Sequence, residues 1–325
     1  MIADRMMQAA ARLGLGLVTR GRLTILIFHR VPALPDPLFP ELWPAALFED
    51  RMRWLASAFT VLPLDEAVLR LRQGRLPPRA AAITFDDGYR DNAEVAAPIL
   101  ARLGLAATFF VADGYLDGGR MFNDTVYEAL RRLPAGEFEL PLPGSPRVSI
   151  DSMVSRRAAA DSLLPELKYL PLAEREFACG QLAALAGSPL PTDLMMSSSQ
   201  VAGLIGQGMA VGGHTVNHPI LASIDAAAAE REIHANKTRL EATTGRRLSL
   251  FAYPNGGPGR DYTRAHVQMV KDAGYEAAVS TSHGAATAAT DPYQLPRFTP
   301  WDLRPGRFEL SFVRNAGAPV RVAPA

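Results

Sequence analysis

Short apolar runs alternate with amphipathic stretches along most of this chain. The runs are rich in β-branched and aromatic residues and end at Gly, Pro or charged residues, which is typical of buried strands. Between residues 47 and 59, apolar residues recur three or four positions apart, which predicts a helix with one apolar face. Strands are predicted at 23–31, 81–85, 105–111, 209–213, 248–253 and 275–281, and helices at 47–59, 92–104, 198–208, 225–244 and 262–274.

This order of strand, helix and strand predicts the fold class. Uniformly apolar strands separated by helices are typical of an α/β fold in which helices cover a parallel sheet, either open or closed into a barrel. The alternation breaks at about 120–197, where helical patterns and Pro-rich links dominate and only 146–150 resembles a strand. We therefore predict a mainly helical insertion at 120–197 that packs over one end of the sheet.

The two ends of the chain lie outside this alternation. An N-terminal amphipathic helix is predicted at residues 1–22, since Asp4 precedes the apolar residues, Arg12 interrupts them and no small-residue cleavage site of a signal peptide follows. The barrel domain is predicted to span 23–312. The small, Pro-containing tail 313–325 is expected to be loose.

Composition excludes several classes of function. Lys plus Arg number 34 against 33 for Asp plus Glu, so no charge excess favours a nucleic acid as partner. Cys179 is the only cysteine, which excludes an intrachain disulfide and a thiolate metal cluster; its context predicts a buried helix position. No stretch reaches the roughly 18 uncharged apolar residues that span a bilayer, so we expect a cytoplasmic protein without an integral membrane segment.

Two carboxylates stand side by side directly after the strand at 81–85, in the sequence "TFDDGY". Asp86 and Asp87 repel each other unless a positive group lies beside them. His214 and His218, in "HTVNH", also follow a strand, and on a helical turn their spacing would point both imidazoles toward one metal. Taken alone, the two histidines could equally be surface or capping residues.

Together the two segments predict a metal site, because the carboxyl ends of parallel strands meet at one edge of a sheet. One aspartate and two histidines leave coordination positions open for water, and the second aspartate could accept a proton from that water. A divalent cation would supply the missing positive charge. Gly88 would let the backbone turn sharply enough for both carboxylates to reach it.

These segments resemble the polysaccharide deacetylase family, carbohydrate esterase family four, with its nodulation-type deacetylase homology domain. The motifs of the family are matched in order by "TFDDGY" at 84–89, "HTVNH" at 214–218 and "FAYPNG" at 251–256, and the resemblance covers roughly 23–312. It implies a distorted (β/α) barrel with seven strands. It also implies the removal of N-acetyl, or sometimes O-acetyl, groups from sugar polymers with a divalent metal, most often Zn²⁺, with Ni²⁺, Co²⁺ or Mn²⁺ as alternatives.

The resemblance further implies roles for individual residues. Asp86 resembles the catalytic base, and Asp87, His214 and His218 resemble the metal ligands. A backbone N–H near Tyr253 would help to hold the oxyanion of the tetrahedral intermediate, which makes Tyr253 a candidate substrate-binding residue.

The third motif lacks the arginine that orients the catalytic aspartate in the family. Arg297, in "QLPRF" after the presumed last strand, could reach Asp86 from there. The alternative is an arginine on a surface loop.

The general-acid histidine of the family's fifth motif is not evident either. His29 ends the first strand and should face the same rim as the metal site, although a satisfied core histidine is an equal alternative. His283 is expected on a loop, and His234 and His266 are expected on the surfaces of helices.

The leading hypothesis is a metal-dependent hydrolase that removes acetyl groups from N-acetylated amino sugars in an oligosaccharide, polysaccharide or glycolipid. The same site could instead hydrolyse another amide, such as a cyclic imide or ureide. A non-catalytic carbohydrate-binding relative is a third hypothesis, because the third-motif arginine is missing. Specificity is expected to reside in the insertion and in the Pro-rich loop 32–44, which leaves the sugar and the oligomeric state open. Trp301 is the favoured sugar-stacking residue, Trp43 and Trp54 are further candidates, and a core role is the alternative for each.

Overall fold

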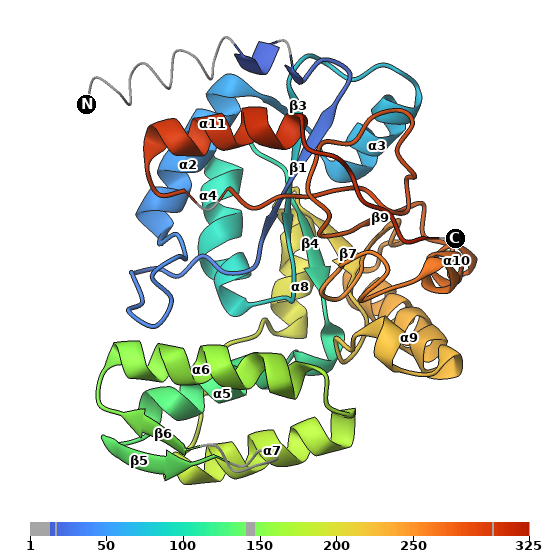
Figure 1. The fold of residues 1–325 in the computed structure, drawn as a ribbon. Helices are drawn as coiled ribbons and strands as arrows, with labels where there is room; N and C mark the ends of the chain where they lie inside the picture. The colour runs from blue at the N-terminus through green and yellow to red at the C-terminus, as the bar shows by residue number, and fades with distance from the viewer. Residues whose placement is uncertain (1–13, 17, 141–146, 301, 325) are drawn as a thin grey trace.

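The centre of the molecule is a sheet of parallel strands (Figure 1). The structure, a computed structural model, describes residues 14–16, 18–140, 147–300 and 302–324. Seven strands form one sheet in the order β1-β3-β4-β7-β8-β9, with β2 paired to β3, and every pair is parallel. The strands are β1 (Leu23–Phe28), β2 (Thr60–Val61), β3 (Ala80–Phe85), β4 (Thr108–Val111), β7 (Ala210–Gly213), β8 (Leu250–Ala252) and β9 (Ala277–Val279).

A short segment, residues 295–298, lies between the first and last strands of the path and closes the barrel. Its two ends, Leu295 and Phe298, form parallel bridges with β9 and β1 respectively. Backbone hydrogen bonds run in both directions between Phe298 and β1, at 3.0 and 3.1 Å. Arg297 therefore lies on the closing segment itself.

Burial on both faces explains why the strands are uniformly apolar. Every residue of β1 and β3 is buried, because one face of the sheet lines the barrel interior and the other packs against helices. The surrounding helices are α2 (Ala45–Ala58), α3 (Leu64–Arg72), α4 (Ala97–Arg102), α8 (Ser198–Gly206), α9 (Ala226–Thr244), α10 (Arg264–Asp272) and α11 (Pro305–Ala316). Short helical turns, η1 (Asn92–Ala96), η2 (Asp113–Tyr115) and η3 (Leu221–Ser223), follow strand ends.

The insertion forms a helical layer at one end of the barrel (Figure 1). It contains α5 (Phe122–Arg132), α6 (Met153–Lys168), α7 (Leu172–Leu185) and an antiparallel hairpin of β5 (Gly136–Glu139) and β6 (Arg147–Ile150). These elements share an apolar core of their own, which Leu38 and Phe39 of the Pro-rich loop join. The loop thus ties the insertion to the barrel.

The predicted fold class is confirmed, and each predicted strand and helix of the barrel overlaps an observed one. Helix α3 is absent from the prediction, although Pro63 before it and Asp65 and Glu66 in its first turn are typical of a helix start. Strand β5 is also absent from the prediction, because its residues are mostly exposed and carry no apolar run. The predicted N-terminal helix at 1–22 lies largely outside the described residues.

The prediction of a loose tail from residue 313 is wrong. Helix α11 continues to Ala316, which is fully buried. Beyond the helix, the Arg321 N–H donates to Ser282 Oγ and the Ala323 N–H donates to Gln294 Oε1, both at 2.7 Å. These hydrogen bonds hold the small, Pro-containing residues against the barrel.

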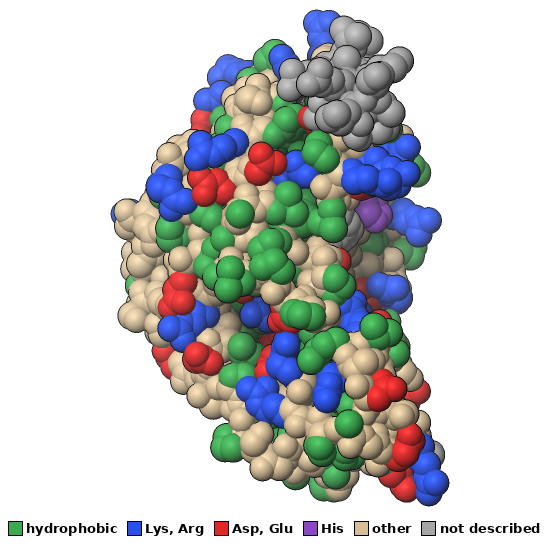
Figure 2. All heavy atoms as spheres, turned by 90° about the vertical axis from the view of Figure 1, so that its left-hand side faces the viewer, with side chains coloured by type: hydrophobic (Ala, Val, Ile, Leu, Met, Phe, Trp, Pro, Cys, Tyr) green, Lys and Arg blue, Asp and Glu red, His purple; other side chains and the backbone are tan. Residues whose placement is uncertain are grey.

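The surface shows no block of a single charge on the face drawn in Figure 2, where acidic and basic side chains are interspersed. Within the described ranges, no helix combines the length and the apolar character needed to cross a membrane.

Candidate active site

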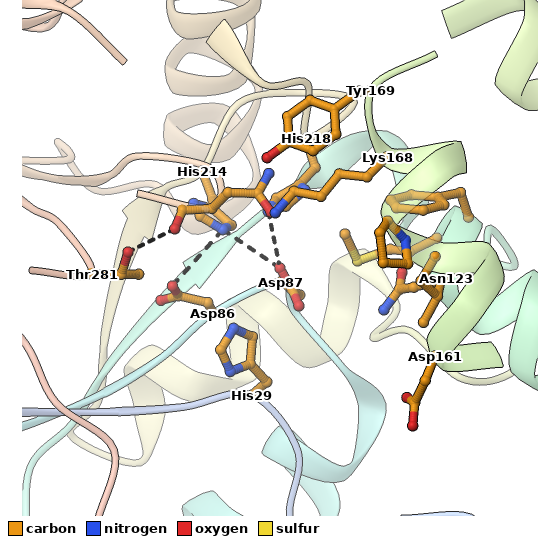
Figure 3. Close-up of a pocket in the computed structure, with 15 residues that line it drawn as sticks. His29, Asp86, Asp87, Asn123, Asp161, Lys168, Tyr169, His214, His218 and Thr281 are labelled. Atoms are coloured by element: carbon orange, nitrogen blue, oxygen red, sulfur yellow. Dashed lines mark hydrogen bonds and ion pairs between the residues drawn. The ribbon is translucent and has the colours of Figure 1, made fainter. Parts of the chain in front are cut away.

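Four of the predicted site residues meet at the carboxyl ends of the strands. Asp86 and Asp87 directly follow β3, and His214 directly follows β7. Together with His218, they line one pocket of about 490 Å³ (Figure 3). Parallel α/β folds place their sites at this edge of the sheet, and the volume is typical of a site for a small molecule.

A strained turn brings both carboxylates into this pocket. Consecutive side chains of a strand point to opposite faces, so adjacent aspartates would normally diverge. Asp87 has a φ of 76° and Gly88 a φ of 93°, so the turn begins one residue before the glycine. A left-handed conformation is unfavourable for a residue with a Cβ atom and persists only where its surroundings hold it, which is common at functional sites.

Asp87 and the two histidines surround a common point. Asp87 Oδ1 lies 3.5 Å from His214 Nε2 and 3.4 Å from His218 Nε2, and the ligand atoms of all three residues lie within 4.8 Å of one another. Ligands about 2.0–2.2 Å from a tetrahedral zinc ion are roughly 3.4 Å apart, so these distances fit. Asp87 Oδ1 is buried and has no hydrogen-bond partner within the described part of the chain. The donor set therefore fits a divalent metal.

The protonation state of His218 suits a metal ligand, and a hydrogen bond orients His214. Burial lowers the pKa of His218 to about 3, which leaves its imidazole neutral at pH 7. Burial acts on His214 as well, but the carboxylates of Asp86 and Asp87 outweigh it and hold the His214 pKa above its ordinary value. His214 Nδ1 donates to the Ala252 carbonyl at 2.7 Å, which directs Nε2 toward Asp87.

Close packing explains the two glycines before His214. A Cβ atom on Gly213 would lie 2.1 Å from the Tyr275 hydroxyl, and one on Gly212 would lie 2.5 Å from the Phe110 ring. Only residues without Cβ allow β7 to approach its neighbours this closely. The glycines thus set the depth at which His214 enters the pocket.

Arg297 reaches Asp86 from the closing segment. Its Nη1 and Nη2 donate to the two carboxylate oxygens of Asp86, each at 2.7 Å, in a bidentate pair. Arg297 Nε donates to the Ser280 carbonyl at 3.0 Å, and Nη1 also contacts Thr84 Oγ1 at 3.1 Å. Arg297 is 1% exposed, so the alternative of a surface-loop arginine is wrong and the predicted contact is confirmed.

Asp86 stays ionised although it is buried. Burial alone would raise its pKa, but Arg297 and then His214 more than offset this effect, so the Asp86 pKa lies below its ordinary value. Asp86 Oδ2 also lies 3.9 Å from His214 Nε2, close to the metal-ligand set. An ionised carboxylate at this place can accept a proton from a water in the pocket.

His29 lies in the same pocket. It follows the last residue of β1, and Figure 3 shows its ring facing the two aspartates. Asn92 Nδ2 donates to the His29 carbonyl at 2.8 Å and fixes its backbone. The predicted location at the rim is confirmed, while its role as an acid remains a prediction.

The insertion supplies a wall of the pocket. Residues from the start of α5 and the second half of α6 line the pocket, and they include two aromatic rings, apolar side chains and polar groups (Figure 3). They are Met121, Phe122, Asn123, Asp161, Leu164, Pro165, Lys168 and Tyr169. No sequence motif indicates this wall, because its residues come together only when the insertion folds over the barrel.

Tyr253 does not line the pocket, so its position does not support the predicted contact with the substrate. Its side chain is fully buried and stacks on Tyr262 with ring centroids 3.9 Å apart, and its N–H donates to the Val279 carbonyl. Asn255, which has a φ of 59°, lines the pocket instead. The chain leaves β8 at Ala252 and reaches the pocket only after Tyr253 has packed beneath it.

The remaining histidines lie away from the pocket. His283 is exposed on a loop and His234 is exposed on α9, as predicted. His266 is buried, which corrects the prediction of a surface position. Its Nδ1 accepts the Thr263 N–H at 3.0 Å and caps the start of α10.

The two tryptophans that the structure describes do not support a role in sugar stacking. Trp43 is buried in the main core, and Trp54 packs against the same core, so the alternative of a core role holds for both. Trp301, the favoured candidate, lies outside the described residues. Cys179 is buried on α7, as predicted.

Comparison with known families agrees with this geometry. The family model for polysaccharide deacetylases matches residues 73–139 and 151–278, which together make up more than half of the chain. A curated relative from Bacillus subtilis (strain 168), "Putative polysaccharide deacetylase YxkH", is 36% identical over 92 residues, which are 28% of this chain. The match spans 32% of the length of that relative.

Solved structures share the fold over almost the whole chain. The Streptococcus pyogenes deacetylase PplD, in complex with acetate, has a TM-score of 0.59 and 19% identity, covering 91% of this chain and 99% of that one. IcaB from Ammonifex degensii has a TM-score of 0.57 and 17% identity, covering 92% and 98%. A de-N-acetylase from Aggregatibacter actinomycetemcomitans has a TM-score of 0.54 and 15% identity, covering 85% and 94%. At these identities the likeness shows the fold alone.

Replacement of Asp87, His214 or His218 by Ala should abolish stoichiometric binding of Zn²⁺, because each residue provides one of three ligand atoms around a common point. Calorimetric titration of the metal-free protein with Zn²⁺ measures this. His283→Ala, which removes an exposed histidine, is the control and should bind one equivalent. A ligand variant that still binds one equivalent would show that the ligand set is wrong.

Proposed function

The chain belongs to the polysaccharide deacetylase family, and we propose that it is a metal-dependent hydrolase that removes acetyl groups from N-acetylated amino sugars. The sugars would be part of an oligosaccharide, a polysaccharide or a glycolipid. One observation carries the proposal: an Asp-His-His ligand set, with Asp87 and His214 buried, lies beside a second aspartate that an arginine keeps ionised. A place for a Lewis acid and a place for a general base thus adjoin, as hydrolysis of an unactivated amide requires.

The metal would be held by Asp87, His214 and His218. Zn²⁺ is the proposed ion because imidazole and carboxylate ligands at these distances suit it, and Ni²⁺, Co²⁺ or Mn²⁺ are alternatives. When bound, it supplies Lewis acidity toward the acetyl carbonyl and makes water more acidic.

Asp86 is the proposed general base. Its bidentate contact with Arg297 fixes the plane of the carboxylate and stabilises the ionised form. After accepting a proton from the attacking water, the neutral carboxyl group would still lie against the guanidinium. This contact favours the return of the proton and prepares the base for the next turnover.

Asn255 is the proposed oxyanion donor. The N–H of this pocket residue makes no hydrogen bond among the described residues. Thr281 Oγ1 donates to the Asn255 carbonyl at 2.8 Å and thereby fixes the direction of the loop. A donor that is already oriented stabilises developing negative charge without reorganisation.

His29 is the proposed general acid. An amide nitrogen must be protonated before it can leave, and the imidazole of His29 faces the pocket from the end of β1. The substrate would lie between these groups and the wall formed by the insertion. The rings of Phe122 and Tyr169 on that wall offer surfaces for a sugar ring.

Acetate release from an N-acetylglucosamine oligomer tests the proposal. Protein freed of metal with a chelator should release no acetate, and the same protein reconstituted with Zn²⁺ should release it. A cyclic imide and a ureide are assayed in parallel, and binding of the oligomer is measured separately. Turnover of only the imide or the ureide, or binding of the oligomer without turnover, would overturn the proposal.

Asp86→Asn should retain the metal and lose activity. The change removes the base but none of the three ligand atoms, so kcat should fall on the order of 10²- to 10⁴-fold. Metal content and kcat are measured on the same preparation. Loss of the metal together with activity would mean that Asp86, not Asp87, is the ligand.

Arg297→Lys should lower kcat/KM on the order of 10²-fold, because one ammonium cannot reproduce the bidentate fork that orients Asp86. Arg297 opposes the effect of burial on Asp86, so its loss should raise the Asp86 pKa. The acid limb of the pH profile of kcat/KM should therefore move to higher pH.

The control for this variant is Arg260→Lys. Arg260 also forms a bidentate pair, with Asp261, but its side chain is 66% exposed and lies outside the pocket. An unchanged acid limb in Arg297→Lys, or an equal shift in Arg260→Lys, would refute the assigned role.

His29→Ala should retain the metal and slow amide hydrolysis on the order of 10²- to 10⁴-fold. An aryl acetate has a leaving group that needs no proton, so the loss of rate should be much smaller for this ester. The measurement is the ratio of the rate loss for the amide to the rate loss for the ester. Equal losses for the amide and the ester would leave Asp86 as both base and acid.

A further inference from the structure

The loop that carries both histidines, residues 214–218, is strained. Thr215 has a φ of 63° and His218 a φ of 49°, and neither is a glycine. Such residues keep this conformation only when neighbouring groups hold them. Because His218 is the last residue of the loop, any relaxation of the loop would move one imidazole relative to the other.

Glu232 of α9 holds the middle of this loop from the outside. Its Oε2 accepts the N–H groups of Val216 and Asn217, both at 2.8 Å, and its Oε1 accepts Asn217 Nδ2 at 2.7 Å. Hydrogen bonds to a carboxylate are stronger than those between neutral groups. Among the described residues, this side chain thus hydrogen-bonds only to two consecutive residues of the loop.

Asn236 lies one helical turn further along α9 and holds the start of the loop. Its Oδ1 accepts the His214 N–H at 2.9 Å, and its Nδ2 donates to the Val111 carbonyl at 3.0 Å and to Asp113 Oδ1 at 2.6 Å. Asn236 is fully buried. The spacing of four residues places Glu232 and Asn236 on the same face of α9, toward the loop.

We propose that Glu232 is a positioning residue that, with Asn236, sets the affinity of the site for a divalent cation. The inference rests on the proposed metal site. Glu232 does not line the catalytic pocket, so it acts through the loop and not on the substrate. By holding the strained backbone, it keeps His214 Nε2 and His218 Nε2 at the distances from Asp87 that suit a metal.

The same helix offers a matched control. Glu241 also accepts a backbone N–H, that of Leu248 at 2.9 Å, but this bond fixes the connection to β8 and not the histidine loop. Glu241→Ala should lower the melting temperature and leave metal affinity unchanged. Glu232→Ala should lower metal affinity on the order of 10- to 100-fold, the usual effect of removing a group that orients a ligand.

Two milder variants guard against failure of Glu232→Ala to fold. In Glu232→Gln, the amide oxygen can still accept both backbone N–H groups, and Asn217 can turn its amide to pair with the new NH₂ group. Glu232→Gln should therefore keep most of the metal affinity that Glu232→Ala loses. Asn217→Ala removes only the bond at 2.7 Å and should give an intermediate loss.

Titration of metal-free protein with Co²⁺, followed by visible absorption, measures affinity and coordination in each variant. Lower affinity in Glu232→Ala with an altered absorption band, recovery in Glu232→Gln and no change in Glu241→Ala support the proposal. Unchanged Co²⁺ affinity in Glu232→Ala, or an equal loss in Glu241→Ala, overturns it while leaving the metal site intact. If the unaltered protein binds no Co²⁺, the proposed function fails and this inference fails with it.

Discussion

A buried ion pair between Arg297 and Asp86 links the barrel of this protein to its proposed chemistry. Two charges out of water are costly unless their geometry is good and their remaining hydrogen bonds are satisfied. Here the pair is bidentate, and further bonds to Ser280 and Thr84 satisfy more of the guanidinium. Removal of one partner from such a pair typically costs about 3–5 kcal/mol, so the closing segment and the end of β3 depend on each other.

The pair also resolves the repulsion between the adjacent aspartates. Arg297 neutralises Asp86 through the bidentate pair, while His214 Nε2 and His218 Nε2 lie 3.5 and 3.4 Å from Asp87. The left-handed backbone at Asp87 lets the two neighbouring carboxylates face one pocket with different main partners. One carboxylate can therefore hold a metal while the other remains available as a base.

The fold and the central site residues could be predicted because their signals are local. Apolar runs mark buried strands, and the two motifs that follow strand ends must meet at one edge of a parallel sheet. Arg297 could be proposed as the partner of Asp86 only because the third motif lacks the arginine that fills this role in the family. Its actual place on the closing segment could not be predicted, since Pro296 interrupts the strand pattern there.

The predictions that the structure does not support concern contacts that the local sequence does not encode. Whether Tyr253 or Asn255 faces the pocket depends on the path of the chain after the end of β8 at Ala252, including the left-handed backbone at Asn255. The tail looks loose by composition, but its backbone hydrogen bonds to residues near 282 and 294 appear only in the folded barrel. In the sequence nothing distinguishes Glu232 from other acidic residues on helices, because its contacts with the histidine loop form only in the folded protein.

A double-mutant cycle between Asp86 and Arg297 tests the central claim most directly. Asp86→Asn, Arg297→Met and the double variant are compared by kcat/KM for acetate release from an N-acetylglucosamine oligomer, with Zn²⁺ content measured in each. If Arg297 acts only through Asp86, the double variant should be no slower than Asp86→Asn alone, and all variants should keep the metal. The account would be contradicted if the losses of transition-state stabilisation in the two single variants added fully in the double variant. Arg297 would then act independently of Asp86.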